Sequence, residues 1–319
     1  MNQEFFENRE HALTHFSEKV TRYIQSGLEG SANTQRGYQA DIRDYAGWCQ
    51  AQLVPAFPVE ADVLSAYLAE LADTARWSTI QRRMSALRKW HELKDLPFPG
   101  KEKQVLAVLE GIRREKGSRQ KQAPALDLDE YRSLIQDLDI QNPTELRDKL
   151  VLLLGFTGAF RRSELVALNI EDLNFSRQGL IITMQRSKTN QYGEIEQKAF
   201  FYHPEPLLCP IRTLEEWLSL RPANGPLFVR FRKGKTHGEV RLTEERLSCK
   251  TVDNLVKHYF GVEFSAHSLR ATFVTVAKLN GADDLEVMQQ TKHRTSAMIQ
   301  RYTRTDDIRK YNAAKKLGL

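Results

Sequence analysis

The sequence predicts a mainly α-helical protein with a small β-sheet, divided into two domains. Apolar residues recur at helical spacing through about the first 115 residues, whereas two strand-like runs flank a polar turn in the second half. Between these parts, residues 113–124 are polar, basic and free of large apolar side chains, which is a linker composition. We therefore expect a helical domain over residues 1–112, a linker over 113–124 and an α+β domain over 125–319.

Four helices are expected in the first domain. The first follows the N-cap candidates Ser31 and Asn33, the third opens at Ser78, and a Pro/Gly break at 97–100 precedes the fourth. Four amphipathic helices can bury a small core of their own. Their apolar stripes are Tyr38, Ile42, Tyr45 and Trp48; Val63, Leu64, Tyr67, Leu68 and Leu71; Ile80, Met84, Leu87 and Trp90; and Val105, Leu109 and Ile112.

The second domain is expected to combine helices with a β-hairpin. Residues 145–156 are apolar enough for a buried helix that ends at Thr157-Gly158. Gly179–Met184 and Gln197–Tyr202 predict two strands around a polar turn near residues 190–194. Further helices are predicted over residues 214–220, 247–260, 268–279 and 285–291.

Composition excludes several classes of protein. The net charge of +6 is mild for a nucleic-acid binder, so the local distribution of charge matters more than the total. Cys49, Cys209 and Cys249 lie far apart without Cys-x-x-Cys spacing, which argues against a disulfide framework or a zinc site. The first residues lack the features of a signal peptide, and no apolar run is long enough to span a membrane. We expect a soluble, cytoplasmic protein.

The most informative residues lie near the C-terminus. His267-Ser-Leu-Arg270 is followed by His293 and then by Tyr302. Nucleophilic attack on a DNA phosphodiester needs cations for the phosphate oxygens, an acid or base, and a hydroxyl that becomes covalently linked. Each residue alone has an ordinary alternative, since a core histidine or a packed tyrosine is common. Upstream, Arg161 and Lys188 complete a set that is harder to explain in that way.

The order Arg161, Lys188, His267-x-x-Arg270, His293, Tyr302 resembles the tyrosine recombinase (phage integrase) family, which performs site-specific DNA strand exchange. The resemblance covers residues 157–319, and residues 31–41 resemble the opening helix of the family's DNA-clamping domain. The nine-residue step from His293 to Tyr302 (302 − 293) is the family's usual one.

Two positions depart from the family pattern. The family often has Gly-Leu-Arg where this chain has Ala159-Phe160-Arg161, and it usually has Gly where this chain has Lys292. Because glycine supplies positive φ readily, we expect the loop before His293 to adopt a different backbone conformation.

The resemblance implies a role for each residue of the set. Tyr302 is the nucleophile, and Tyr311 is its nearest competitor. Arg161 and Arg270 clamp the non-bridging phosphate oxygens with guanidinium groups that keep their charge throughout the reaction. Glu164 lies three residues after Arg161, where it either orients Arg161 or a histidine or pairs with Arg161 structurally.

The proton-transfer roles leave one alternative open. Lys188 is the candidate general acid for the 5′-hydroxyl leaving group, and Lys292 is a second lysine that substitutes for it or assists it. His267 is the candidate base, and His293 is a candidate donor to a phosphate oxygen. No metal is needed, since arginines take the electrostatic role of metal ions, and the chain has no ATP-binding loop motif.

The resemblance also implies partners. The two domains form a clamp around double-stranded DNA that carries specific recombination sites, and a homotetramer joins two synapsed sites. Exchange proceeds through a 3′-phosphotyrosine. The resemblance implies that the tail 308–319 docks on the neighbouring protomer; the alternative is a helix folded back on its own domain or a frayed terminus. Whether directionality factors assist is left open. The protein would act at the prokaryotic nucleoid. The candidate DNA contacts are Arg36, Arg43, Arg82, Arg83, Arg88, Lys89, Arg113, Arg114 and Lys116.

Two rival functions share the resemblance. A type IB topoisomerase uses similar chemistry, but there another basic residue usually replaces the first histidine, so His267 favours a recombinase. A catalytically inactive DNA-binding protein of the same fold is the other rival, and the complete residue set argues against it.

Overall fold

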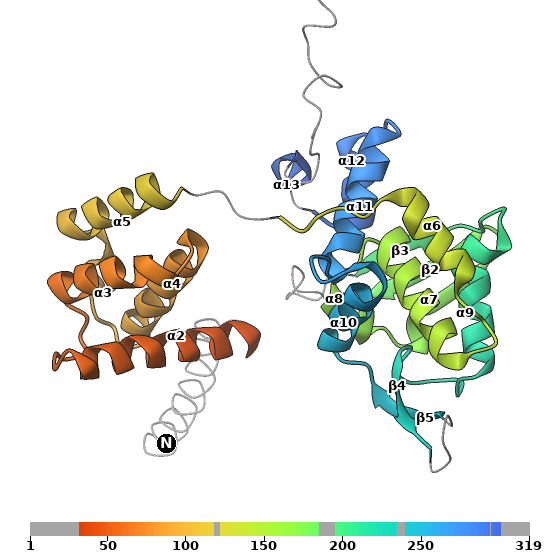
Figure 1. The fold of residues 1–319 in the computed structure, drawn as a ribbon, viewed down its shortest axis with the longest axis horizontal. Coiled ribbons are helices and arrows are strands. Elements are labelled where there is room, and N and C mark those ends of the chain that lie inside the picture. Colours follow the sequence, from red (N-terminus) through yellow and green to blue (C-terminus); the bar gives the residue numbers. More distant parts are fainter. Residues whose placement is uncertain (1–31, 118–121, 185–194, 235–239, 294, 301–319) are drawn as a thin grey trace, which may run out of the picture. The chain divides into compact units, whose positions relative to one another are not determined.

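The structure, a computed structural model, describes residues 32–117, 122–184, 195–234, 240–293 and 295–300. The chain divides into two units, Met1–Lys121 and Gln122–Leu319 (Figure 1). Each unit has its own hydrophobic core. The predicted fold class is confirmed: both units are mainly helical, and the described strands all lie in the second unit. None of the described helices is long and apolar enough to cross a membrane.

The first unit contains the four predicted helices. They are α2 (Ala32–Ala51), α3 (Ala61–Thr74), α4 (Trp77–Glu92) and α5 (Lys103–Lys116), with a 3-10 turn at Pro99–Lys101. Helix α2 packs against α4, and α3 packs against α5. Asn33 lies inside α2 rather than at its N-cap, and Ser31 lies outside the described residues.

The predicted apolar stripes form the core of the first unit. Tyr45, Leu64 and Leu68 are fully buried, and the rings of Tyr45 and Tyr67 meet edge to face at 4.9 Å. Buried His91 fixes the loops around this core. Its Nε2 accepts from the Val59 amide at 3.0 Å, so Nδ1 carries the proton and donates to the Pro97 carbonyl at 2.7 Å.

The predicted linker begins too early. Residues 113–116 form the last turn of α5, where Glu110 pairs with Arg113 and Arg114 at helical spacing. Gly117 ends the helix with φ of 71°, a conformation that glycine adopts at low cost. The basic residues 113, 114 and 116 are therefore displayed on a helix, and residues 118–121 lie outside the described part of the chain.

The second unit alternates helices with two small sheets. Its helices are α6 (Leu128–Asp137), α7 (Pro143–Thr157), α8 (Arg162–Ala167), α9 (Pro210–Ser219), α10 (Cys249–Phe260), α11 (Ala266–Leu279), α12 (Asp284–Thr291) and α13 (Ser296–Gln300). Short 3-10 turns lie at Ile170–Asp172 and Pro206–Leu208. The strands are β1 (Leu173–Ser176), β2 (Gly179–Met184), β3 (Glu196–Phe200), β4 (Val229–Lys233) and β5 (Val240–Arg246).

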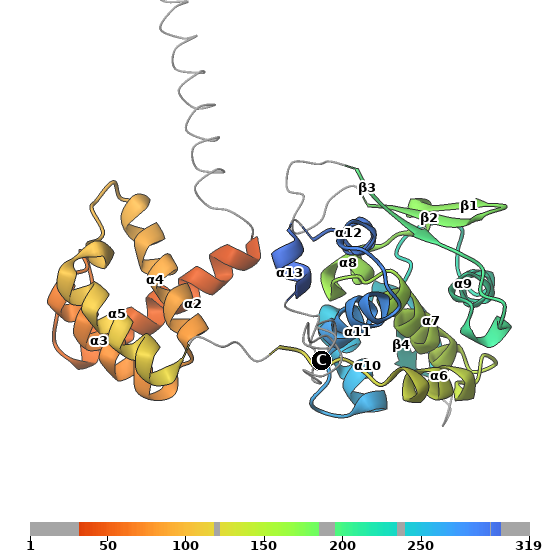
Figure 2. The same cartoon turned by 90° about the horizontal axis from the view of Figure 1, so that it is seen from above.

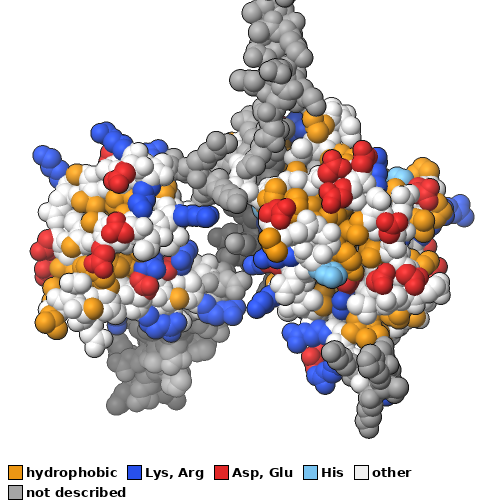
Figure 3. Space-filling model, viewed as in Figure 1, with side chains coloured by type: hydrophobic (Ala, Val, Ile, Leu, Met, Phe, Trp, Pro, Cys, Tyr) orange, Lys and Arg blue, Asp and Glu red, His pale blue; other side chains and the backbone are white. Residues whose placement is uncertain are grey.

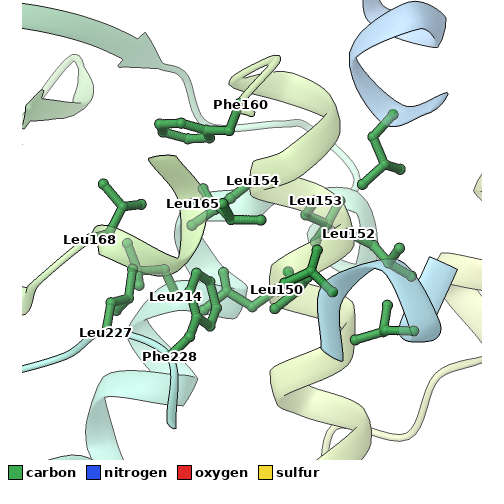
Figure 4. Packing of buried hydrophobic residues seen from close by; sticks show 14 of the residues in the cluster. Leu150, Leu152, Leu153, Leu154, Phe160, Leu165, Leu168, Leu214, Leu227 and Phe228 are labelled. Carbon is green, nitrogen blue, oxygen red and sulfur yellow. The ribbon is translucent and has the colours of Figure 1, made fainter. Parts of the chain in front are cut away.

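Helix α7 is the centre of this unit. Its leucines interleave with Leu214 of α9 and with Leu227 and Phe228, which precede β4 (Figure 4). Gly155 lets α11 approach closely, since a Cβ there would lie 2.8 Å from Leu269 Cδ1. This contact sets the position of α11, the helix that carries His267 and Arg270.

Two antiparallel sheets flank the helices. The first has the order β1-β2-β3 and lies along one side of the unit, with α12 against β3 (Figure 2). Leu180 and Ile182 of β2 face the core, while Ile181 between them is exposed. The second sheet is a β4–β5 hairpin that the sequence did not predict, and Lys and Arg side chains gather over it in Figure 3.

Candidate active site

Arg161 stands at the start of α8, and Glu164 fixes it there. The Arg161 amide donates to Glu164 Oε2 at 2.9 Å, while its guanidinium pairs with Oε1 of the same carboxylate. Glu164 therefore pairs with Arg161, which fits both the orienting and the structural role predicted for it, and closes the N-terminus of the helix. The next residue, Arg162, points to α10 and pairs with Asp253.

The other end of α8 is closed by a residue far along the chain. The Arg246 guanidinium, at the end of β5, donates to the carbonyl oxygens of Val166 at 2.7 Å and Leu168 at 2.9 Å. It also donates to Asn169 Oδ1 at 2.5 Å. These bonds satisfy carbonyls that a short helix leaves without intrahelical partners.

Arg270 ties together two segments that carry predicted site residues. We name residues 158–161 the arginine segment and residues 290–293 the histidine segment. Arg270 is 1% exposed and donates to the Ala159 carbonyl at 2.6 Å and the Thr291 carbonyl at 2.5 Å. The guanidinium predicted to clamp a phosphate thus also holds the two segments in register.

At the two positions where the family pattern has glycine, this chain has a non-glycine residue with positive φ. Ala159 has φ of 45° and Lys292 has φ of 56°, in the left-handed region that glycine adopts easily. We expected the lysine to change the loop. The structure shows instead that Lys292 takes the left-handed conformation itself and ends α12 by donating its amide to the Met288 carbonyl at 2.8 Å.

His293 is buried and hydrogen-bonded to Thr291. Its Nδ1 lies 2.9 Å from Thr291 Oγ1, which donates its own proton to the Val287 carbonyl at 2.7 Å. Nδ1 is therefore the donor to Thr291, and the neutral ring presents Nε2 as an acceptor. Desolvation lowers the pKa of His293 to about 3, helped by the charges of Arg270 and Arg161. To donate to a phosphate oxygen as predicted, His293 must gain a proton when the anion enters.

His267 lies on the first turn of α11, at the exposed side of the same group. Desolvation lowers the pKa of its imidazole, and the positive charges of Arg270 and Arg161 lower it further. A neutral histidine is the form that accepts a proton, which suits the predicted role of base. The structure thus brings Arg161, Arg270, His267 and His293 into mutual electrostatic range.

Lys198 joins this group, although the sequence did not single it out. Its side chain is buried, and its ammonium donates to the Gly158 carbonyl at 2.8 Å and to the Gln290 carbonyl. The alternation of β3 was the available signal, since Lys198 and Phe200 both face inward. The group therefore holds more positive than negative charge. The carboxylate of Glu164 is the negative charge that raises the pKa of Lys198.

Three predicted residues cannot be placed. Lys188, Tyr302 and the competitor Tyr311 lie outside the described residues, as does the turn near 190–194. Their roles stay predictions. In the part of the chain that the structure describes, no group of three or more His, Cys, Asp or Glu side chains gathers at metal-binding distance.

The candidate DNA contacts of the first unit differ in how they are engaged. Arg36, Arg43, Arg88, Arg113, Arg114 and Lys116 are exposed, although Arg113 and Arg114 pair with Glu110. Lys89 is half-buried and pairs with Glu92 at 3.2 Å. Arg82 pairs with Asp41 while half of its side chain remains exposed. Arg83 is only 16% exposed and is bonded to Asp44 and Tyr67. A phosphate would have to displace those partners, so the structure does not favour Arg83 as a contact.

Comparisons with known proteins cover nearly the whole chain. Residues 124–309 match the model of the phage integrase family, and residues 19–94 match that of the phage integrase N-terminal SAM-like domain. An "integrase/recombinase xerD homolog" from Selenomonas ruminantium is 36% identical over 313 residues, covering 94% of this chain and 90% of that protein. A tyrosine recombinase XerC from Pelobacter propionicus is 25% identical, covering 88% of this chain and 87% of its own length.

Solved structures share the fold at lower identity. The Tn1549 transposon integrase in complex with transposon right end DNA has a TM-score of 0.61 and 15% identity, covering 94% of this chain and 98% of its own. The XerH site-specific recombinase bound to a palindromic difH substrate has a TM-score of 0.58 and 18% identity, covering 81% of this chain and 72% of its own.

Proposed function

The chain belongs to the phage integrase family, and from that premise we propose how its residues cleave and rejoin DNA. It is a site-specific DNA recombinase of the tyrosine type. We assign the chemistry to Arg161, Lys188, His267, Arg270, His293 and Tyr302, with Glu164 and Lys292 in support. One observation carries this assignment: Arg270 joins the arginine segment to the histidine segment within a group of excess positive charge.

The positive group is suited to an anion that gains charge during the reaction. As the Tyr302 oxygen attacks phosphorus, the pentavalent transition state carries more negative charge than the diester. Arg161 is held in place by Glu164 before any DNA binds, so little reorganisation is needed. Electrostatic stabilisation of this kind is commonly the largest contribution to catalysis.

The proton transfers complete the step. The tyrosine oxygen forms a bond to phosphorus, its proton passes to His267, and the bond from phosphorus to the 5′-oxygen breaks. Lys188 gives a proton to that leaving oxygen, with Lys292 as the alternative donor. The bond energy is stored in the 3′-phosphotyrosine, so the reverse attack by a 5′-hydroxyl rejoins the strand without ATP.

DNA is the partner of this protein. We further propose that the DNA is duplex carrying specific recombination sites and that a homotetramer forms on two synapsed sites at the nucleoid. The exposed basic residues of α2, α4 and α5 are proposed to contact phosphates. We propose that the two domains, with the bounds predicted above, clamp the duplex. The linker between them begins only after α5 ends at Lys116.

A suicide substrate tests the proposal. DNA with a nick near the cleavage point loses its 5′-hydroxyl after cleavage and so traps the covalent complex. Tyr302→Phe should bind the half-site normally and form no covalent complex, because only the hydroxyl is removed. Tyr311→Phe is the matched control and should be captured as the wild type is. Covalent capture of Tyr302→Phe would refute the assignment of the nucleophile.

A further inference from the structure

Lys198 is a buried cation to which the roles above assign no task. Its side chain is 1% exposed and faces inward from β3, opposite Ile182 of β2. Its ammonium bonds the Gly158 carbonyl at 2.8 Å and the Gln290 carbonyl, and lies 4.9 Å from the centre of the Phe160 ring. Burying an ammonium is unfavourable unless polar partners offset the lost hydration. The two carbonyls explain how the lysine is tolerated, but not why a lysine is used.

The bonds of Lys198 run beside those of Arg270. Lys198 joins Gly158 to Gln290, and Arg270 joins Ala159 to Thr291. Two cations thus connect two consecutive residues of the arginine segment to two consecutive residues of the histidine segment. These bonds are made two or three residues before Arg161 and His293. They therefore fix the backbone from which the side chains of Arg161 and His293 project.

The charged groups around Lys198 come from three elements. Glu164 and Arg161 belong to α8 and its N-cap, Arg270 to α11, and Lys292 follows α12. Desolvation is the main cause that lowers the pKa of Lys198 to about 7; the three cations lower it further and Glu164 opposes them. A phosphate bound among these cations would favour the protonated form.

We propose that Lys198 is a positioning residue for DNA cleavage, which holds the arginine segment against the histidine segment and adds its charge to the anion site. This inference rests on the proposed function. Lys198 need not touch the DNA, since it acts through the two segments and through its field.

Protonation separates the two parts of this role. A neutral amine still has two N–H donors for the two carbonyls, so deprotonation keeps the connection and removes only the charge. With subsaturating DNA, where the free enzyme titrates, the rate of cleavage should therefore fall as pH rises through about 7. With saturating DNA, the decline should move to higher pH, because the bound phosphate stabilises the ammonium.

Three variants divide the role experimentally. Lys198→Met removes the connection and the charge, whereas Lys198→Arg retains a charge that does not titrate. Gln290→Met is the matched control. The Gln290 side chain donates at 3.0 Å to the carbonyls of both Thr157 and Ala199, so it crosses the same interface without a charge.

Single-turnover cleavage of the suicide substrate is then measured from about pH 6 to about pH 9, with half-site binding recorded in parallel. Lys198→Met should bind the half-site, cleave at least about tenfold more slowly at the acidic end, and show no decline near neutrality. Lys198→Arg should cleave without that decline. Gln290→Met should keep the wild-type decline, whatever its rate, because its Lys198 still titrates.

Two outcomes would overturn the inference. One is a wild-type decline that persists unchanged in Lys198→Arg, which would assign the titration to another group. The other is a Lys198→Met rate at the acidic end that equals the wild-type rate, which would reduce Lys198 to an ordinary packing residue. Thermal unfolding checks that Lys198→Met folds; if it does not, the comparison of wild type with Lys198→Arg decides. Failure of the wild type itself to form a covalent complex would instead refute the proposed function.

Discussion

Replacing Lys292 by glycine should stabilise the second unit. Lys292 has φ of 56° at the end of α12, and an L-residue in this conformation is strained by about 1–2 kcal/mol. Glycine removes that strain but gives up about 0.5–1 kcal/mol of backbone entropy on folding. The midpoints of these two ranges differ by about 0.75 kcal/mol, which is the expected gain in the free energy of unfolding. In a unit of this size that gain corresponds to about 1–4 °C in melting temperature.

Calorimetry of the full chain would measure the change, with two controls. Gln289 is exposed within α12 itself, so Gln289→Gly should lower the free energy of unfolding by about 1 kcal/mol. Leu53 has φ of 58° and is exposed in the first unit, so Leu53→Gly should stabilise that unit without touching the site. If Lys292→Gly destabilises the protein as Gln289→Gly does, the argument from backbone strain is wrong.

Three further experiments address the chemistry and the assembly. If Lys188 is the general acid, Lys188→Ala should slow cleavage of an ordinary substrate far more than cleavage of a 5′-bridging phosphorothiolate, because the sulfur leaves without protonation. If the phosphorothiolate instead restores cleavage by Lys292→Ala, Lys292 is the general acid. Cleavage should survive EDTA, and an absolute magnesium requirement for that step would contradict the assignment. Deleting residues 308–319 should spare half-site binding and abolish cooperative occupancy of the full site; equal loss of both would show that the tail belongs to its own protomer's fold.

A further prediction follows from the pKa of Lys198. Because it is lowered from 10.5 to about 7 by folding, the unfolded chain binds more protons between these values. The free energy of unfolding should therefore rise with pH above about 7, by at most about 1.4 kcal/mol per pH unit. Lys198→Met should remove this contribution from the slope. An identical slope in the variant would mean that Lys198 remains charged in the folded protein.

The sequence predicted those features that depend on local pattern. The end of α7 at Thr157, the strands β2 and β3, and the helices of the first unit follow from apolar periodicity and glycine breaks. Helix α6 was missed although Asp127 caps it, accepting from the amides of Asp129 and Glu130 at 3.0 Å. That cap is a local signal that could have been used.

The β4–β5 hairpin was also missed, although apolar residues alternate with arginines in β4 and at the start of β5, which is a local strand signal. Other features were out of reach for physical reasons. The role of Lys198 depends on carbonyls 40 and 92 positions away, which no local pattern encodes. The order of the predicted site residues could be recognised without knowing these long-range contacts, because it rests on the spacing of short motifs alone.

The short helix α8 has a consequence for when the protein can act during its own synthesis. Six residues are too few to hold a helix by themselves, and the C-terminal carbonyls of α8 are satisfied by Arg246, some 80 positions later. The arginine segment in turn depends on Arg270, 111 positions after Ala159. A nascent chain that has emerged only as far as Arg161 therefore lacks every one of these supports. The position of Arg161 is therefore fixed only after Arg246 and Arg270 have both been made.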